Sequence, residues 1–362
     1  IFNSQFSMKK RIVIKVGTGV LVTKTGKLDQ KVLSHIVDQM AALLKEGHQL
    51  ILVSSGAVGA GRELISFKKE EATMEKRMLA AVGQTRLMEK YRNLFEKYGI
   101  EVAQILPLRD DFHHREKYIT IRDTLERLMT NRIIPILNEN DVLASADLRF
   151  SDNDNLAALT AVAVKADHII FLTDIKGLYD ANPDRNKNAK LIKEVKEITP
   201  EIKKEASGAV SKLGLGGMIN KLVSIEMCTR ACIEADICYG KGEESLSNAA
   251  LGLRPGTHFP AICHTKKAKY LGRKAWLAAG VVPTGSIVID EGAYDALKKG
   301  KSLLAVGVKK VMGQFNSGDV VSILDQKNIP IGTGMVHCSS EALNLKDHLS
   351  KPVIHADNLV VW

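Results

Sequence analysis

The sequence predicts an α/β protein, in which a mainly parallel sheet sandwiched by helices is followed by a small mixed β-barrel. In the first 265 residues, short runs rich in β-branched residues alternate with longer segments whose apolar residues recur at helical spacing. Strands that alternate with helices form a mainly parallel sheet covered on both faces. After residue 265 the strand-like runs become shorter and glycines separate them, a pattern typical of a small β domain.

The first predicted strand is RIVIKV at residues 11–16, and a helix follows it at 29–46, where Gly47 ends it. The apolar residues of this helix lie on one side, which we expect to face the sheet. Further strands are predicted at residues 49–53, 101–106, 133–137, 168–172 and 236–239. Further helices are predicted at residues 75–98, 116–130, 155–165 and 216–233, with a projecting hairpin at 176–181.

In the tail, a helix is predicted at residues 265–279. Strands are predicted at residues 286–289, 303–306, 320–324 and 329–336, with a last one near Val360. These patterns divide the chain into an expected first domain at residues 8–265 and a second at 266–362. Residues 1–7 precede Met8, and we interpret them as a remnant or an upstream extension. They are therefore left out of the fold prediction.

Of the 362 residues, 45% are hydrophobic and 25% charged, which is typical of a soluble globular protein. No apolar run approaches the roughly 18 residues of a membrane span, and the first residues lack the pattern of a signal peptide. The five cysteines lack zinc-like spacing, so we expect a protein of the reducing cytoplasm.

The net charge of +10 raises the question of nucleic-acid binding. The chain has no long basic run, and residues 268–362 hold 11 Lys or Arg against 8 Asp or Glu, a net of +3. A mild attraction for anions such as nucleotides is enough to explain this balance.

Two glycine-containing segments follow predicted strands. Lys15-Val16-Gly17-Thr18-Gly19 ends the first strand, where exposed backbone N–H groups and a lysine suit an anion, although a tight turn with a solvated lysine explains it equally well. SSGAVGAG at residues 54–61 permits close approach of a ligand at a helix start. Taken alone, we favour close helix packing as the explanation of this second segment.

Polar residues gather in two further segments, NEND at residues 138–141 and DNDN at 152–155. The first ends a strand and the second opens a helix. Aspartate or asparagine as a helix cap explains one of them but not four in a row. Amides and carboxylates together suit a zwitterionic ligand, so we expect the 152–155 run at a reaction centre.

The segment GLGGMINK at residues 214–221 places glycines at the start of a helix and Lys221 within its first turns. This arrangement favours a phosphate cradle with a cation directed into it, more than a glycine-rich loop with a solvated lysine.

Taken in order, these segments resemble the amino-acid kinase family, most closely its bacterial members that phosphorylate glutamate. The matching stretches are IKVGTGVL at 14–21, SSGAVGAGRE at 54–63, LAAVGQTRL at 79–87, RDTLERLM at 122–129, NENDVLA at 138–144, SDNDNLAAL at 151–159, LTDIKGLYDANP at 172–183 and GLGGMINKL at 214–222. The resemblance covers essentially the whole chain, and the tail resembles a PUA domain, a fold associated with RNA.

The resemblance implies a role for each matching residue. Lys15 and Lys221 would contact the transferred phosphoryl group, and Asp154 would orient the two lysines. The residues implied to bind glutamate are Ser55, Asp141 and Asn153. The residues implied to bind ATP are Lys15, Thr173, Asp174, Gly216, Gly217, Met218 and Lys221. Mg²⁺ would be held mainly by phosphates and water, so no protein ligand is named.

The implied reaction is ATP-dependent phosphorylation of the γ-carboxylate of L-glutamate to L-glutamyl 5-phosphate, the first step of proline biosynthesis. Feedback inhibition by proline and assembly into a dimer or tetramer are implied as well. The chain departs from the family at Gly19, Ser151 and Leu215, where Ser, Gly and Thr are usual. The last change removes a hydroxyl near the nucleotide.

Two kinds of alternative stay open. Kinases of the same fold act on acetylglutamate, aspartate or uridylate, and Asp141 favours a ligand with a free amino group over an acetylated one. The chain could instead be an RNA-binding or RNA-modifying protein led by its tail, although the small net charge there argues against high affinity. A modulatory or oligomer-related role for the tail agrees with the sequence as well as RNA binding does.

Overall fold

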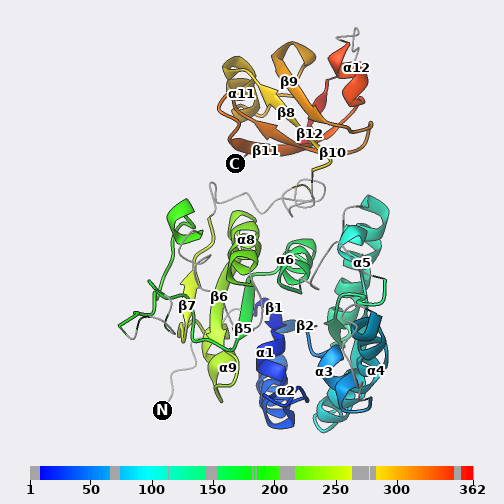
Figure 1. Ribbon diagram of the computed structural model, residues 1–362, viewed down its shortest axis with the longest axis vertical. Helices are drawn as coiled ribbons and strands as arrows, with labels where there is room; N and C mark the ends of the chain where they lie inside the picture. Colours follow the sequence, from blue (N-terminus) through cyan, green and yellow to red (C-terminus); the bar gives the residue numbers. More distant parts are fainter. Residues whose placement is uncertain are drawn as a thin grey trace. The chain divides into compact units, whose positions relative to one another are not determined.

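The computed structural model describes residues 9–65, 74–112, 114–143, 153–181, 183, 186, 188–203, 217–262, 277, 283–345 and 352–361 (Figure 1). The chain separates into two compact units, Ile1–Ile262 and Cys263–Trp362, and each is described by itself. The helix expected at residues 265–279 lies outside the described residues, apart from Leu277.

The first unit is built on a seven-stranded sheet in the order β3-β4-β2-β1-β5-β6-β7. Its strands are β1 (Arg11–Val16), β2 (Gln49–Ser54), β3 (Val102–Ile105), β4 (Ile134–Leu137), β5 (His168–Thr173), β6 (Glu234–Tyr239) and β7 (Thr257–Phe259). Every neighbouring pair is parallel except β6 and β7, which are antiparallel. The α/β class and the mainly parallel sheet predicted from the sequence are therefore confirmed.

Helices cover both faces of this sheet (Figure 1). One face carries α5 (Arg115–Thr130), α6 (Asn153–Ala163) and α8 (Gly217–Arg230), of which α6 packs against β1, β2 and β5. The other face carries α2 (Gln30–Lys45), α4 (Met74–Glu96) and α9 (Ser245–Ala250), together with the short helices α1 (Thr18–Leu21) and α3 (Ala57–Arg62).

Side chains of β1 alternate between these two helical layers, because successive residues of a strand point to opposite faces. Ile12, Ile14 and Val16 belong to a core cluster with the apolar face of α2. Lys15 therefore points to the opposite face, where α6 and α8 lie. The alternation places Lys15 near the carboxyl end of the central strand, on the face of the sheet that α6 and α8 cover.

The glycines of SSGAVGAG let α3 approach α4 closely. A Cβ added at Gly61 would lie 2.1 Å from the backbone oxygen of Leu79, and one added at Gly83 would lie 1.8 Å from that of Ala57. Close helix packing, the explanation favoured for this segment from the sequence, is confirmed for these positions.

Three features of the first unit differ from the prediction. α6 begins at Asn153, two residues before the predicted start, so Asn153 and Asp154 are its first residues. The short elements β7 and α9 were missed, because three strand residues and six helix residues give almost no periodicity. Among the described cysteines of this unit, Cys228 and Cys238 are free and Cys232 is disulfide-bonded, which the cysteine spacing did not predict.

The second unit contains a mixed five-stranded sheet in the order β12-β11-β10-β8-β9, in which only β8 and β10 pair in parallel. Its strands are β8 (Gly285–Ile289), β9 (Val308–Gly313), β10 (Val320–Leu324), β11 (Pro330–Val336) and β12 (Ile354–Val361). The helices α11 (Glu291–Lys298) and α12 (Ser340–Asn344) accompany the sheet. A buried cluster that includes Ile287, Val321 and Ile354 forms its own core.

The prediction of a strand at residues 303–306 is wrong. Leu303 makes a single bridge to Ile354, and residues Ala305–Gly307 form a 3-10 turn in which Val306 is 84% exposed. The strand lies further on, at Val308–Gly313, where Lys309 and Lys310 interrupt the apolar alternation. An edge strand tolerates such charges because one of its sides faces water.

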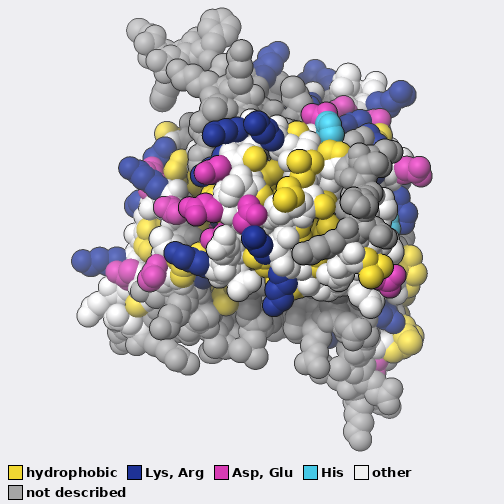
Figure 2. Space-filling model, turned by 90° about the horizontal axis from the view of Figure 1, so that it is seen from above, with side chains coloured by type: hydrophobic (Ala, Val, Ile, Leu, Met, Phe, Trp, Pro, Cys, Tyr) yellow, Lys and Arg dark blue, Asp and Glu magenta, His cyan; other side chains and the backbone are white. Residues whose placement is uncertain are grey.

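No helix among the described residues is long and apolar enough to cross a membrane. On the face of the molecule drawn in Figure 2, the coloured Lys and Arg side chains lie among Asp and Glu side chains rather than in one block.

Candidate active site

Polar residues collect at the carboxyl edge of the parallel sheet. Lys15 lies near the end of β1, Ser55 directly follows β2, and Thr173 ends β5. Because these strands are parallel neighbours, their carboxyl ends lie along one edge of the sheet. α6 adds Asn153 and Asp154 from its first turn, and α8 adds Lys221 from its second turn.

The centre of this edge is a carboxylate shared by two lysines. Asp154 Oδ1 lies 2.7 Å from Lys15 Nζ, and Asp154 Oδ2 accepts a hydrogen bond of 2.7 Å from Lys221 Nζ. All three residues are buried. Lys221 Nζ also lies 5.1 Å from the centroid of the Phe171 ring, whose residue pairs with Lys15 across β1 and β5. The packing thus fixes two ammonium groups at one point.

The charges of this group favour binding of an anion. Burial raises the pKa of Asp154, but the ammonium groups of Lys15 and Lys221 outweigh it and lower the pKa to about 2. The carboxylate therefore stays ionised at neutral pH. The two ammonium groups and the one carboxylate give this buried group a net positive charge, and electrostatic interactions are stronger there than in water.

A chain of amide and hydroxyl groups lies beside the lysines. Asn153 Nδ2 donates to Ser55 Oγ at 3.0 Å and to Asn138 Oδ1 at 2.9 Å. Asn153 Oδ1 accepts from the backbone N–H of Glu139 at 3.2 Å. Asn138 Nδ2 in turn donates to Gln84 Oε1 at 2.9 Å. Buried polar groups with defined partners hold fixed orientations, which is what recognition of a small polar ligand requires.

The remaining glutamate-binding candidate is Asp141. It follows β4 and is partly exposed, and its backbone N–H donates to Glu139 O at 2.8 Å. Asp152, the first residue of the DNDN run, lies outside the described residues.

The candidate nucleotide residues lie at the ends of β5 and at the start of α8. Thr173 Oγ1 donates to Ile175 O at 2.7 Å, and the carboxylate of Asp174 lies over Gly19, where an added Cβ would come within 2.9 Å of Asp174 Oδ2. Gly217 and Met218 open α8, with Gly217 exposed and Met218 partly exposed. Gly216 lies outside the described residues.

In the described part of the chain, no group of three or more His, Cys, Asp or Glu side chains is placed to hold a metal ion.

A family model for amino acid kinases matches residues 10–238. The chain belongs to the amino acid kinase family. A PUA-domain model matches residues 285–355 of this amino acid kinase. The candidate site residues named above all lie within the first match, and all of them except Asp152 and Gly216 are among the residues that the structure describes.

Several relatives match over nearly the full length. The chain is 42% identical to glutamate 5-kinase of Shewanella pealeana, over 91% of this chain and 88% of that protein. It is 40% identical to glutamate 5-kinase of Vibrio vulnificus, over 98% and 97% of the two chains. It is also 40% identical to glutamate 5-kinase 2 of Pseudoalteromonas translucida, over 97% and 98%.

Two polar residues of this kinase's site went unassigned in the sequence analysis. Gln84 and Asn138 lie in the matching stretches LAAVGQTRL and NENDVLA, but a glutamine within an amphipathic helix gives no sign of its partner. The structure distinguishes both by their burial: Gln84 is 9% and Asn138 3% exposed, whereas amide side chains are mostly exposed in proteins.

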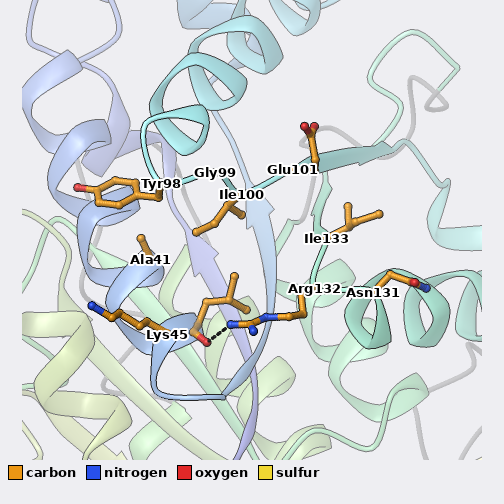
Figure 3. Close-up of a pocket in the computed structure, with 10 residues that line it drawn as sticks. Ala41, Lys45, Tyr98, Gly99, Ile100, Glu101, Asn131, Arg132 and Ile133 are labelled. Atoms are coloured by element: carbon orange, nitrogen blue, oxygen red, sulfur yellow. Dashed lines mark hydrogen bonds between the residues drawn. The ribbon is translucent and has the colours of Figure 1, made fainter.

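A pocket of about 440 Å³ lies at the opposite edge of the sheet (Figure 3). Glu101 and Ile133, which precede β3 and β4, line it together with Lys45 and Tyr98. Arg132 reaches across it and donates to Leu44 O at 3.4 Å. Since this edge carries the amino ends of the strands, the pocket is separate from the lysine pair and the amides.

Proposed function

We propose that this chain is a glutamate 5-kinase, which transfers the γ-phosphoryl group of ATP to the γ-carboxylate of L-glutamate and so makes L-glutamyl 5-phosphate, the first step of proline biosynthesis. The observation that carries the proposal is the pair of buried lysines held on one carboxylate beside a set of oriented amides. The names and near-complete coverage of the relatives support the choice of glutamate.

The main obstacle to this reaction is the approach of two anions. A glutamate side chain with a reference pKa of about 4.3 is already ionised at neutral pH, so the transfer needs no general base. Lys15 and Lys221 would contact the transferred phosphoryl group and offset the charge that spreads over its oxygens. Asp154 would keep both ammonium groups at that point, and Mg²⁺ bound with the nucleotide would neutralise part of the phosphate charge.

Recognition of glutamate would rest on Ser55, Asn153 and Asp141. The hydroxyl of Ser55 suits the α-carboxylate, and the amide oxygen of Asn153 and the carboxylate of Asp141 suit the free ammonium group. Recognition of ATP would rest on residues at the ends of β5 and β1 and the start of α8. These are Lys15, Thr173, Asp174, Gly216, Gly217, Met218 and Lys221.

The experiment that tests the proposal is a glutamate-dependent ATP-turnover assay in which hydroxylamine traps the acyl phosphate as a hydroxamate. L-Glutamate should support both ATP consumption and hydroxamate formation. N-acetylglutamate, aspartate and uridylate serve as parallel substrates. Phosphorylation of N-acetylglutamate without phosphorylation of glutamate would overturn the choice of substrate.

Inhibition by proline and assembly into a dimer or tetramer belong to the same proposal, as does a cytoplasmic location. Proline shares the α-carboxylate and the charged amine of glutamate, so we expect it to compete at the glutamate site. Proline added to the assay should raise the apparent KM for glutamate, and unchanged rates at saturating proline would reject regulation in this chain. Light scattering of the purified protein gives the oligomeric state.

The second unit gives a reason to test for RNA, because residues 285–355 match a PUA domain. On the face drawn in Figure 2, the coloured Lys and Arg side chains are interspersed with Asp and Glu, which argues against strong, nonspecific binding of nucleic acid at that face. An absorbance ratio that shows nucleic acid carried through purification would favour RNA binding, and a protein free of it would favour a modulatory role.

A further inference from the structure

The amide chain beside the lysines has a defined direction. Asn153 donates to Ser55 on one side and to Asn138 on the other, and Asn138 donates in turn to Gln84. The four side chains are 3–9% exposed. Gln84 comes from α4, which covers the face of the sheet opposite to α6.

This direction decides which atoms are left for a ligand. Both N–H bonds of the Asn153 amide are used, one on Ser55 Oγ and one on Asn138 Oδ1. Asn153 Oδ1 accepts from Glu139 N and keeps one lone pair. Since Ser55 Oγ accepts from Asn153, the hydroxyl hydrogen of Ser55 remains to be donated.

The orientation of Asn138 depends on the acceptor at Gln84. If Asn138 turned its amide over, its Oδ1 would face Gln84 Oε1, and two acceptors would oppose each other in a buried place. Its Nδ2 would also face the Nδ2 of Asn153. A buried polar group without a partner costs about 1–3 kcal/mol, so the acceptor at Gln84 favours the observed orientation.

α4 is a firm support for this acceptor. Gly83, next to Gln84, lies so close to α3 that an added Cβ would come within 2.3 Å of Gly61 N. Seven residues further along α4, Tyr91 shares a hydrogen bond of 2.8 Å with Ser54 Oγ, beside Ser55. The helix is thus held against α3 at one place and against the end of β2 at another, which restrains Gln84 relative to Ser55.

From these contacts we infer that Gln84 is a positioning residue for substrate recognition. Together with the backbone N–H of Glu139, it fixes the orientation of the Asn153 amide through Asn138, so that Ser55 donates its hydroxyl hydrogen to the α-carboxylate of the amino-acid substrate and Asn153 Oδ1 accepts from its ammonium group. The inference rests on the proposed function, because it takes glutamate as the ligand.

The test compares two substitutions of Gln84 by steady-state kinetics. Gln84→Met keeps the length of the side chain and removes the acceptor, so the KM for glutamate should rise roughly tenfold, the effect of about one lost hydrogen bond. The KM for ATP should change less than about twofold, because the lysine pair is untouched. Gln84→Glu keeps an acceptor oxygen in either protonation state, and should restore the KM for glutamate to within about threefold of the unmodified chain.

A matched control separates positioning from general loss of stability. Gln39 is also 9% exposed, and its Oε1 accepts from the backbone N–H groups of Leu246 and Ser247, away from the site. Gln39→Met should lower the melting temperature and leave the KM for glutamate unchanged. If it raises that KM as much as Gln84→Met does, the effect is structural and the inference is wrong.

A double-mutant cycle tests whether Gln84 acts through Ser55. In the unmodified background, Gln84→Met should raise the KM for glutamate roughly tenfold. In a Ser55→Ala background the same substitution should have a much smaller effect, because the hydroxyl that Gln84 positions is absent. Equal factors in both backgrounds would overturn the inference. The unmodified chain distinguishes the two proposals: if it does not phosphorylate glutamate, both fall, and if it does while the variants fail this pattern, only the positioning role falls.

Discussion

Asp154 Oδ2 lies 2.7 Å from Lys221 Nζ, a contact between the first turn of α6 and the second turn of α8. The other oxygen of the same carboxylate lies 2.7 Å from Lys15 Nζ on β1. One side chain therefore joins three elements that are far apart in the sequence.

Replacing either lysine should slow the chemical step. We expect Lys15→Ala or Lys221→Ala to lower kcat by roughly 10²- to 10³-fold, the usual effect of removing one group that stabilises transition-state charge. The KM for glutamate should change far less, since the amides and Ser55 remain. Lys90 is the matched control, because it is also largely buried and paired, at 3.1 Å from Glu63. Normal turnover of both lysine variants would remove them from the mechanism.

Asp154→Asn keeps the shape of the side chain and removes its charge. The two ammonium groups then repel each other without a shared partner, so one of them should move away or lose its proton. We expect kcat to fall at least roughly 10²-fold at neutral pH. Turnover measured under saturating ATP and glutamate checks this, and a variant with kcat within a few-fold of the unmodified chain would contradict the orienting role.

The same carboxylate gives a pH dependence of stability. The pKa of Asp154 is about 2 in the folded protein against an ordinary value of 3.8, because Lys15 and Lys221 outweigh the effect of burial. A lowered pKa contributes stability above the ordinary value, and that contribution is lost as the pH falls towards 2. It amounts to about 2 kcal/mol at neutral pH.

Denaturant unfolding of the unmodified chain and of Asp154→Asn, at several pH values from 7 down to 3, measures this contribution. The difference between their free energies of unfolding should be largest at neutral pH and shrink below about pH 4. A difference that grew on acidification would have the wrong sign for an ion-paired carboxylate.

Asp141→Asn should weaken binding of glutamate through its ammonium group. We expect the KM for glutamate to rise by roughly tenfold and the KM for ATP to stay unchanged, because a charge-assisted hydrogen bond becomes a neutral one. N-acetylglutamate carries no charged amine, so the low rate at which it is phosphorylated should be the same in Asp141→Asn and in the unmodified chain. Equal effects on glutamate and N-acetylglutamate would argue against contact with the amine.

Gly83→Ala should destabilise the first unit by roughly 1–3 kcal/mol or more, because the new methyl group would collide with the backbone of α3 at Ala57 O. Gly292, in α11 of the second unit, is the control, since an added Cβ there would meet only an ordinary contact of 3.5 Å with Asp290 Oδ1. Gly292→Ala should be neutral or slightly stabilising, as alanine favours a helix over glycine. Melting curves of the two variants give the comparison.

Much of the fold followed from local pattern. The buried runs of β1, β2, β4 and β5 were found within one or two residues, because long alternations of strands and amphipathic helices leave a clear periodic signal. A strand was predicted at residues 303–306, where the chain forms a tight turn, because the apolar residues of this turn resemble a strand. The strand β9 was missed because two lysines interrupt its apolar pattern. Short elements at sheet edges depend on pairing more than on their own residues.

The sequence by itself determined that polar residues follow the strands of a parallel sheet, and so that Lys15, Ser55 and Thr173 lie along one edge. Only the tertiary structure decided which of them touch. Asp154 meets Lys15 and Lys221 because α6 packs over β1 and α8 packs against α6, and Gln84 reaches the amides because two glycines let α4 lie against α3. Contacts of this kind depend on the angle and distance between packed elements, which no periodicity within one segment encodes.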